Sequence, residues 1–365
     1  MQPPIYYTPD IEQIPDDEAE TIAGLNAVLK DILDTTSADY GHAVRAVHAK
    51  SHGLIEAELE VRADLPSELA QGLFANPGRH PAVLRISTNP GDILADSISV
   101  PRGVALKIMN VDGPRLEGAE GRTQDFIMVN GPVFSAPDAA SFLKNLKLLA
   151  KTTDRAEWAK KALSAVLRGT ERALEAVGGE SATLKTMGGA PNVHPLGETY
   201  YTQTAFRFGD HVAKLSLVPV SQTLTRHTGE MINAKGRPDA LRETIAQDAA
   251  KGPCEWDLRV QLCRDLEKMP VEDPTVLWGE EISPFRSVAI LRAAPQPGWS
   301  EARAAIVDET LRFSVWTGLE AHRPLGSVNR VRRATYEMSS GFRARTNGCP
   351  IHEPATVTLP RPDLT

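Results

Sequence analysis

The segments Arg45-Ala-Val-His48-Ala-Lys50, Arg85-Ile-Ser87-Thr and Gln124-Asp-Phe-Ile-Met-Val-Asn130-Gly-Pro-Val-Phe134 decide how this 365-residue sequence is interpreted. Together they supply a base at His48, a neutral amide at Asn130 and several cationic groups. These are the groups that heterolytic cleavage of a peroxide O–O bond requires. A further segment near the C-terminus, Arg332-Arg-Ala-Thr-Tyr336, adds a phenol that could serve as an iron ligand.

The composition argues against several classes of protein. The net charge of −7 gives no electrostatic basis for binding nucleic acid or an anionic membrane. No apolar run approaches the roughly 18 residues of a membrane span, and the first residues lack the basic and apolar regions of a signal peptide. The three cysteines form no CxxC pair, which is typical of a reducing compartment. We therefore expect a cytoplasmic protein.

The apolar pattern predicts one α+β domain over residues 21–365, after an extended arm over residues 1–20 that is rich in Pro, Asp and Glu. Helices are expected over residues 21–33, 138–150, 157–177, 301–311 and 328–345. Strands are expected over residues 44–61, 83–87, 103–110, 125–129, 200–208, 213–220, 258–262 and 288–291. Many short strands separated by turn residues favour a barrel or a sandwich.

His48 is the candidate base. Arg45 precedes it by three residues, and the small residues Ala46 and Ala49 leave room beside it for a flat cofactor. A structural histidine is the common alternative. A zinc site is a second alternative because His52 follows four residues later. However, this segment lacks the glutamate of a zinc protease motif and has no evident third ligand.

The dipeptide Asn130-Gly131 is in the first place a hairpin turn signal. Because it follows an apolar run, the Asn130 amide could instead point into a cavity and hydrogen-bond a peroxide without competing for its proton. Arg45, Arg85 and Arg102 lie in or beside apolar segments, where a guanidinium needs an anionic partner. Structural carboxylates and the propionates of a haem are both suitable partners.

Arg332, Tyr336 and Arg343 are spaced by four and seven residues, which places them on one face of a helix. A free tyrosine has a pKa of about 10, whereas a neighbouring guanidinium and a ferric ion favour its phenolate form. The alternative is an exposed basic helix that carries a tyrosine.

In this order the segments resemble the haem catalase family, and most closely its short, catalase-related bacterial members. The resemblance implies a catalase-like antiparallel β-barrel with surrounding helices, a bound haem b, and a C-terminal helix whose Tyr336 ligates the iron. It makes His48 the catalytic base, with Ser87 bonded to it, and Asn130 the group that orients the peroxide. The haem-binding residues that it implies are Arg45, Val47, Arg85, Phe142, Arg332, Tyr336 and Arg343. Asp96 and Asn89 would lie in the substrate channel.

Departures from the family pattern bear on activity. The segment Ser51-His52-Gly53 stands where the family has Gly-x-Gly, Asn89 replaces a channel valine, and Ser135 replaces an aromatic residue near the haem. A wider and more polar channel favours peroxidase turnover with a small organic electron donor over efficient dismutation of H₂O₂. The short N-terminal arm favours a homodimer.

Other functions fit the same resemblance. A fatty-acid hydroperoxide isomerase or dehydratase of the allene oxide synthase type is the alternative enzyme. Those relatives carry threonine where this chain has Val47, which favours the peroxidase interpretation. A non-enzymatic haem carrier would not need a base at His48. A structural protein without haem is the last alternative.

Overall fold

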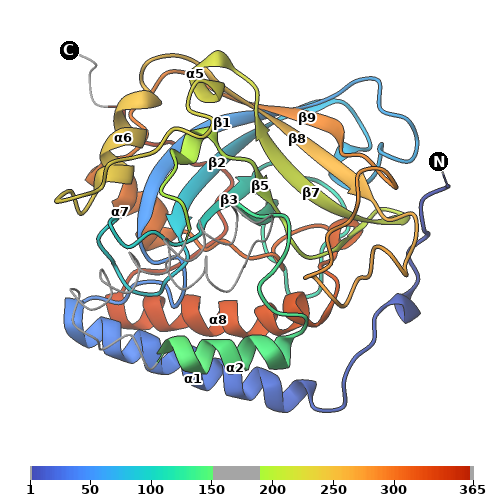
Figure 1. Ribbon diagram of the computed structural model, residues 1–365, viewed down its shortest axis with the longest axis horizontal. Helices are drawn as coiled ribbons and strands as arrows, with labels where there is room; N and C mark the ends of the chain where they lie inside the picture. Colours follow the sequence, from blue (N-terminus) through green and yellow to red (C-terminus); the bar gives the residue numbers. More distant parts are fainter. Residues whose placement is uncertain (1, 151–189, 362–365) are drawn as a thin grey trace, which may run out of the picture.

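The computed structural model describes residues 2–150 and 190–361, and an antiparallel barrel forms its centre (Figure 1). Its strands are β1 (Ser51–Val61), β2 (Gly78–Thr88), β3 (Arg102–Ile108), β4 (Gln124–Val129), β5 (Tyr200–Tyr201), β6 (Phe206–Phe208), β7 (His211–Pro219), β8 (Cys254–Leu262) and β9 (Arg286–Ala293). The strand order is β5-β4-β3-β2-β1-β9-β8-β7-β6. Because β5 pairs with both β4 and β7, the sheet closes on itself.

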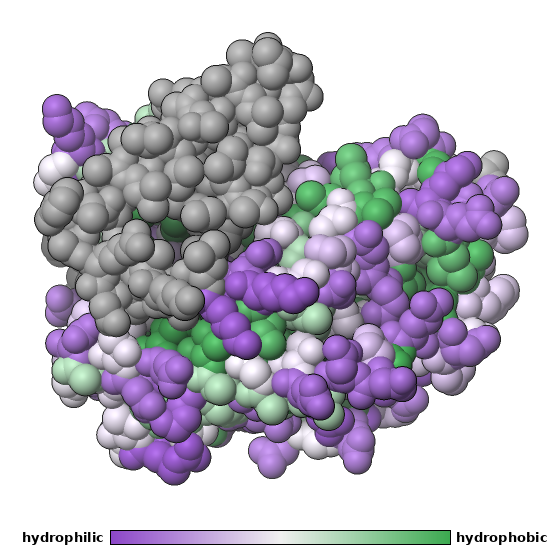
Figure 2. Space-filling view, turned by 60° about the horizontal axis from the view of Figure 1, so that its bottom comes forward, coloured by the Kyte–Doolittle hydropathy of each residue, from purple (hydrophilic) through white to green (hydrophobic). Residues whose placement is uncertain are grey.

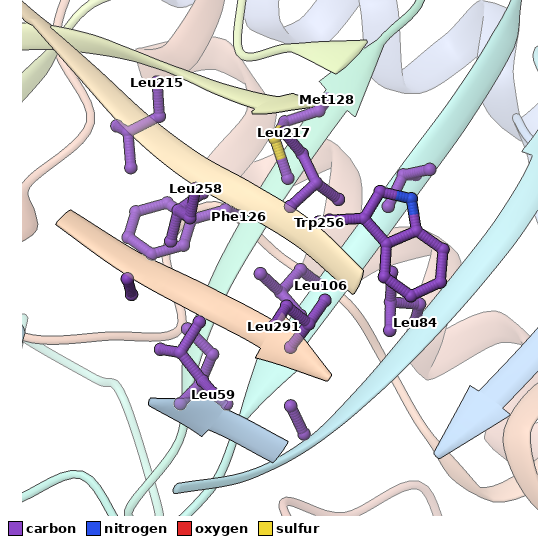
Figure 3. Packing of buried hydrophobic residues seen from close by; sticks show 14 of the residues in the cluster. Leu59, Leu84, Leu106, Phe126, Met128, Leu215, Leu217, Trp256, Leu258 and Leu291 are labelled. Atoms are coloured by element: carbon purple, nitrogen blue, oxygen red, sulfur yellow. The ribbon is translucent and has the colours of Figure 1, made fainter. Parts of the chain in front are cut away.

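Apolar side chains fill the barrel because they alternate with outward-facing residues along each strand. On β2, for example, Leu84 and Ile86 belong to the buried core, while Arg85 and Ser87 lie on the outer face. Figure 3 shows how side chains from different strands meet in the interior; those labelled include Leu59, Leu84, Leu106, Phe126, Trp256, Leu258 and Leu291. The outer faces of the strands are thereby left for contacts with helices and for the site.

Three long helices pack together beside the barrel, below it in Figure 1: α1 (Glu18–Tyr40), α2 (Ala139–Ala150) and α8 (Ser327–Asn347). Leu29 of α1, Ala139 of α2 and Val331 of α8 share one buried apolar cluster. The shorter helical elements are α5 (Gln222–Thr225), α6 (Ala240–Asp248), α7 (Glu301–Thr310) and the 3-10 turns η1 (Pro9–Ile11), η2 (Gly72–Phe74), η3 (Pro195–Gly197) and η4 (Glu320–His322). Of these, α6 and α7 pack on β1.

The structure confirms the predicted barrel and most predicted elements, with three differences. Residues 44–50 are not part of a strand, because His48 adopts a left-handed φ of 55° and the N–H groups of His48 and Ala49 bind the carbonyls of Asn89 and Pro90. The strand expected over residues 200–208 is divided into β5 and β6. Helix α6 was not predicted, and the helix expected over residues 157–177 lies outside the described residues.

The N-terminal arm follows the barrel before α1 begins. The N–H of Ile5 donates to the Cys263 carbonyl (2.8 Å), and the N–H of Tyr7 donates to the Asp210 carbonyl (2.8 Å). Figure 2 shows the underside of the molecule, where apolar residues occur in groups between hydrophilic ones. None of the helices in the described ranges combines the length and the apolarity needed to cross a membrane.

Candidate functional site

A cavity with an empty volume of about 700 Å³ lies between the outer face of β2–β4 and the helices α1 and α8. The small residues Gly103 and Ala105 of β3 contribute to its barrel wall, where larger side chains would reduce the space. The cavity brings together seven of the residues singled out from sequence: Arg45, Val47, His48, Arg85, Ser87, Tyr336 and Arg343. The loop before β1, the strand β2 and the helix α8 therefore contribute to one site, as predicted.

The loop before β1 and the barrel wall fix the position of the His48 ring. The backbone N–H of His48 donates to the Asn89 carbonyl (2.9 Å), and its ring Nδ1 lies 3.1 Å from the Ser87 hydroxyl. An added Cβ at Gly103 would lie 2.6 Å from the His48 Cε1 atom. Only glycine therefore allows the ring to pack this closely against β3.

The surroundings of His48 hold its ring in the neutral form, in which a ring nitrogen can accept a proton. Burial, and then the positive charges of Arg85, Arg332 and Arg45, lower the pKa of His48 to about 3. The ring is therefore neutral near pH 7. If the Ser87 hydroxyl fixes the ring through Nδ1, Nε2 remains available to exchange a proton with a ligand in the cavity.

Arg45, Arg85 and Arg343 converge on Asp308 of α7, and these four residues are called the arginine cluster here. The Asp308 Oδ1 atom accepts from Arg45 Nη1 (2.8 Å) and from Arg85 Nε (2.6 Å). Burial alone would raise the pKa of the Asp308 carboxyl, but Arg85 and Arg45 outweigh it and lower the pKa to about 2. The cluster thus sets three guanidinium groups against one ionised carboxylate.

Arg343 is bound only by backbone carbonyls. Its Nη1 donates to the carbonyl of Asp308 (2.6 Å) and its Nη2 to that of Leu311 (3.2 Å), while its buried Nε has no partner among the described residues. Burial, and then repulsion from Arg85, lower the pKa of Arg343 to about 10, which leaves it charged at neutral pH. A buried cation with an unused donor is suited to an anionic ligand.

Tyr336 lines the cavity from α8, and the helix places it as the spacing predicted. Within residues 2–150 and 190–361, its hydroxyl forms no hydrogen bond. The neighbouring wall positions on α8 are the short side chains Thr335, Ser339 and Ser340. A phenol oxygen that is free of other partners is available as a ligand.

The donor set of this cavity fits a haem. Leu29, Ile127 and Phe313 supply apolar wall, as a porphyrin ring requires. The Tyr336 phenol and the Arg343 Nε, which has no partner among the described residues, would suit an iron ion and a carboxylate.

Asn130 is placed differently from the expectation that its amide faces the cavity. Its Oδ1 accepts from the Arg102 N–H (2.9 Å), its Nδ2 donates to Glu198 (2.7 Å), and it is not among the lining residues. A carboxylate is a strong acceptor, so Glu198 determines where the amide points. Glu198 also binds Arg102 through both oxygens (2.7 Å each), which gives Arg102 a structural partner rather than a haem propionate.

The two residues expected in the channel do not line the cavity. Asp96 forms a buried ion pair with Lys50 (2.8 Å), and its other oxygen accepts from the Leu241 N–H (2.7 Å). With this side chain only 1% exposed, burial raises the pKa of Asp96 despite the lysine. Asn89 contributes its carbonyl to His48, but neither Asn89 nor Ser135 lines the cavity. Their channel roles stay predictions.

Phe142 and Arg332 lie at the margin of the site. Phe142 of α2 packs in the helix cluster with Val47, and its ring centroid is 5.2 Å from that of Phe134. The Arg332 guanidinium lies 5.7 Å from the Phe134 ring and donates to Asn329 Oδ1 (3.0 Å). Neither residue lines the cavity, so their predicted contacts with haem stay predictions.

Sequence reasoning missed a second group of charges next to the cavity. Arg312 lines the cavity and pairs with Glu353 (2.7 Å), while Lys107 pairs with Asp125 (2.8 Å) and with Glu353 (2.5 Å). These four residues are called the Lys107 cluster. Phe313 connects the two clusters: its ring centroid lies 6.0 Å from the Arg45 guanidinium and 5.6 Å from Lys107 Nζ.

One further cluster has the composition of a metal site. The ligand atoms of His194, His227 and Asp248 lie within 4.8 Å of one another. However, His227 Nε2 accepts from Arg226 Nε (3.0 Å), and Asp248 also binds Lys251 (2.5 Å) and His194 (2.9 Å). A metal ion would have to displace two cationic side chains, so these contacts favour a structural network.

Comparisons with known proteins identify the fold. No family model matches the sequence, and no curated protein matches it. Solved structures do: catalase A from Saccharomyces cerevisiae is similar at a TM-score of 0.58 and 19% identity, over 86% of this chain and 63% of that one.

A fungal catalase matches at a TM-score of 0.57 and 18% identity, over 90% of this chain and 67% of its own. A bacterial catalase matches at 0.57 and 17%, over 90% of this chain and 64% of its own. This chain thus spans about two thirds of the length of these catalases. The protein has a catalase-like fold.

Proposed function

We propose that this chain is a haem-dependent hydroperoxidase that decomposes H₂O₂ or organic hydroperoxides. The observation that carries the proposal is one cavity that holds a neutral histidine, a free phenol and an excess of guanidinium groups. A haem b bound there would supply a redox-active iron. Tyr336 would hold the iron, and Arg45, Arg85 and Arg343 would hold the propionates.

The chain's own residues would move the proton of the peroxide. Neutral His48 accepts a proton from one peroxide oxygen and returns it to the other, which then leaves as water when the O–O bond breaks. Ser87 orients the ring through Nδ1. Because the pKa of His48 is about 3, this base should not titrate between pH 5 and 8.

The test is an absorption spectrum of the purified protein, followed by two variants. Tyr336→Phe should lose haem or change the charge-transfer bands, with Tyr6→Phe in the exposed arm as a control. His48→Ala should keep its haem but consume peroxide about 10²-fold more slowly. A Tyr336→Phe protein with full haem content and an unchanged spectrum would contradict the ligand assignment.

We further propose that peroxidase turnover with small organic donors exceeds O₂ release. Support comes from Asn89 and Ser135, which replace an apolar and an aromatic residue of the family. Asn89→Val combined with Ser135→Phe should raise the ratio of O₂ release to dye oxidation.

The alternative, rearrangement of fatty-acid hydroperoxides, predicts a rearranged lipid without donor consumption. A homodimer is also proposed, and light scattering would measure its mass.

A further inference from the structure

We propose that Asp308 is a positioning residue that takes the place of cofactor carboxylates while the cavity is empty. It holds Arg45 and Arg85 in position, so that the arginine cluster is formed before any cofactor binds. The inference rests on the proposed function, because it assigns the remaining positive charge to a cofactor with two carboxylates.

The contacts of Asp308 support this role. One oxygen, Oδ1, bridges Arg45 Nη1 (2.8 Å) and Arg85 Nε (2.6 Å). Its backbone carbonyl accepts from Arg343 Nη1 (2.6 Å), so a single residue contacts all three guanidinium groups. Among the described residues, no other acidic side chain forms an ion pair with any of the three.

The protein holds Asp308 from the side away from the arginines. Its second oxygen, Oδ2, accepts from the Ser51 hydroxyl at the start of β1 (2.7 Å), and Ser51 in turn accepts from Trp299 Nε1 (3.1 Å). The orientation of the carboxylate is thus set by the barrel and needs no ligand. The Asp308 side chain is 19% exposed, compared with 2% for Arg85.

The charges of the cluster match a dicarboxylate. Three guanidinium groups and one carboxylate leave a net charge of +2. Buried cations without any counter-ion would be strongly destabilising, so one carboxylate is needed before the cofactor arrives. Two further carboxylates would complete the neutralisation. Loss of Asp308 should therefore make folding dependent on the cofactor.

The experiment compares melting temperatures of cofactor-free wild type, Asp308→Asn and Glu309→Gln. Glu309 is the matched control: it is the next residue of α7 and its charge also acts on Arg45 and Arg343, but it forms its ion pair with His42 (2.9 Å). Each protein is also measured with protoporphyrin IX, which has two carboxylates, and with its dimethyl ester, which has none. Metal-free porphyrin makes the readout independent of iron chemistry and of activity.

Cofactor-free Asp308→Asn should melt roughly 5–10 °C below wild type, and Glu309→Gln within about 2 °C of it. Protoporphyrin IX should restore most of the loss in Asp308→Asn, and the diester should restore little. A purely structural aspartate would give the same loss with either porphyrin. That result, or an unchanged melting temperature of the cofactor-free variant, would overturn the inference.

Two further variants cover the case in which Asp308→Asn does not fold. Ser51→Ala removes the contact to Oδ2 and the acceptor of Trp299 Nε1, and it should show a smaller loss with the same dependence on porphyrin carboxylates. Asp308→Glu keeps the charge and should retain most of the stability. If the wild type binds neither porphyrin, the proposed function fails. If the wild type binds protoporphyrin IX, but this porphyrin restores the melting temperature of Ser51→Ala no better than its dimethyl ester does, only the role of Asp308 fails.

Discussion

The two charged clusters that meet at Phe313 differ in net charge. In the arginine cluster, three guanidinium groups face one carboxylate, and the pKa of Asp308 is lowered to about 2 despite its burial. In the Lys107 cluster, Lys107 and Arg312 face Asp125 and Glu353, so the formal charges cancel. Burial, opposed by Lys107 and supported by Glu353, raises the pKa of Asp125 to about 7.

This difference in net charge is what we expect between the proposed ligand site and a group of structural ion pairs. A balanced cluster is complete within the chain and serves stability. An unbalanced cluster keeps charge for a ligand, and of the eight residues that define the two clusters only Arg343 has an orphaned donor, its Nε. Removing a cation from the Lys107 cluster should therefore mainly lower stability. Removing one from the arginine cluster should mainly weaken ligand binding.

The largest effect is expected for Lys107→Met. Asp125 and Glu353 would then share a buried space without the lysine that neutralises them, which should lower the free energy of unfolding by roughly 3–5 kcal/mol. Urea denaturation measures this loss. Lys30→Met is the control, because it breaks only an exposed pair with Asp34 and should cost less than about 1 kcal/mol. Similar losses in both variants would contradict the comparison.

Arg343→Met should lose little stability but much of its affinity for porphyrin. It removes a cation that has no ion-pair partner, so the free energy of unfolding should fall by only about 1–2 kcal/mol for the lost bonds to carbonyls. Protoporphyrin IX should nevertheless bind about tenfold or more weakly, which a fluorescence titration would detect. Arg345→Met, on the same helix but exposed, should leave binding unchanged. Undiminished porphyrin binding in Arg343→Met would show that the surplus charge has another purpose.

The last prediction concerns pH. Because the folded-state pKa of Asp125 is raised from 3.8 to about 7, its contribution favours the folded state below about pH 4 and is lost as pH rises to about 7. The stability of wild type relative to Asp125→Asn should therefore decrease over this interval. Taking the difference cancels the titrating groups that do not interact with Asp125, whereas Glu353, whose titration depends on Asp125, still contributes to it. A difference that is constant or increases with pH would refute the assignment.

Sequence patterns predicted the fold and the residues of the cavity better than the orientation of polar side chains. Ser87, Tyr336 and Arg343 meet at the cavity because strand alternation and helical spacing fix where they lie. His48 lies in the loop before β1, where its contacts with Asn89 and Ser87 fix its position. Asn130 could not be placed in this way, because its partner Glu198 is 68 residues away and nothing in the spacing connects them.

The same reason explains two contacts that the sequence did not indicate. Lys50 forms a buried ion pair with Asp96, 46 residues away, and the channel role of Asp96 stays a prediction. Asp308 was read only as part of a predicted helix, since a single aspartate on an amphipathic helix is unremarkable in sequence. Its importance comes from the convergence of Arg45 and Arg85, which only the folded chain brings about.

The position of α8 in the chain has a consequence for biosynthesis. Ala46 next to His48 hydrogen-bonds Ser339 near Tyr336 (3.3 Å), although the two residues are 293 positions apart in sequence. All strands of the barrel leave the ribosome before α8 does, because chains are made from the N-terminus. The wall that carries His48 can thus form early, but the pocket cannot retain a cofactor until α8 has emerged and docked. Binding of the proposed haem would therefore follow the synthesis and docking of α8.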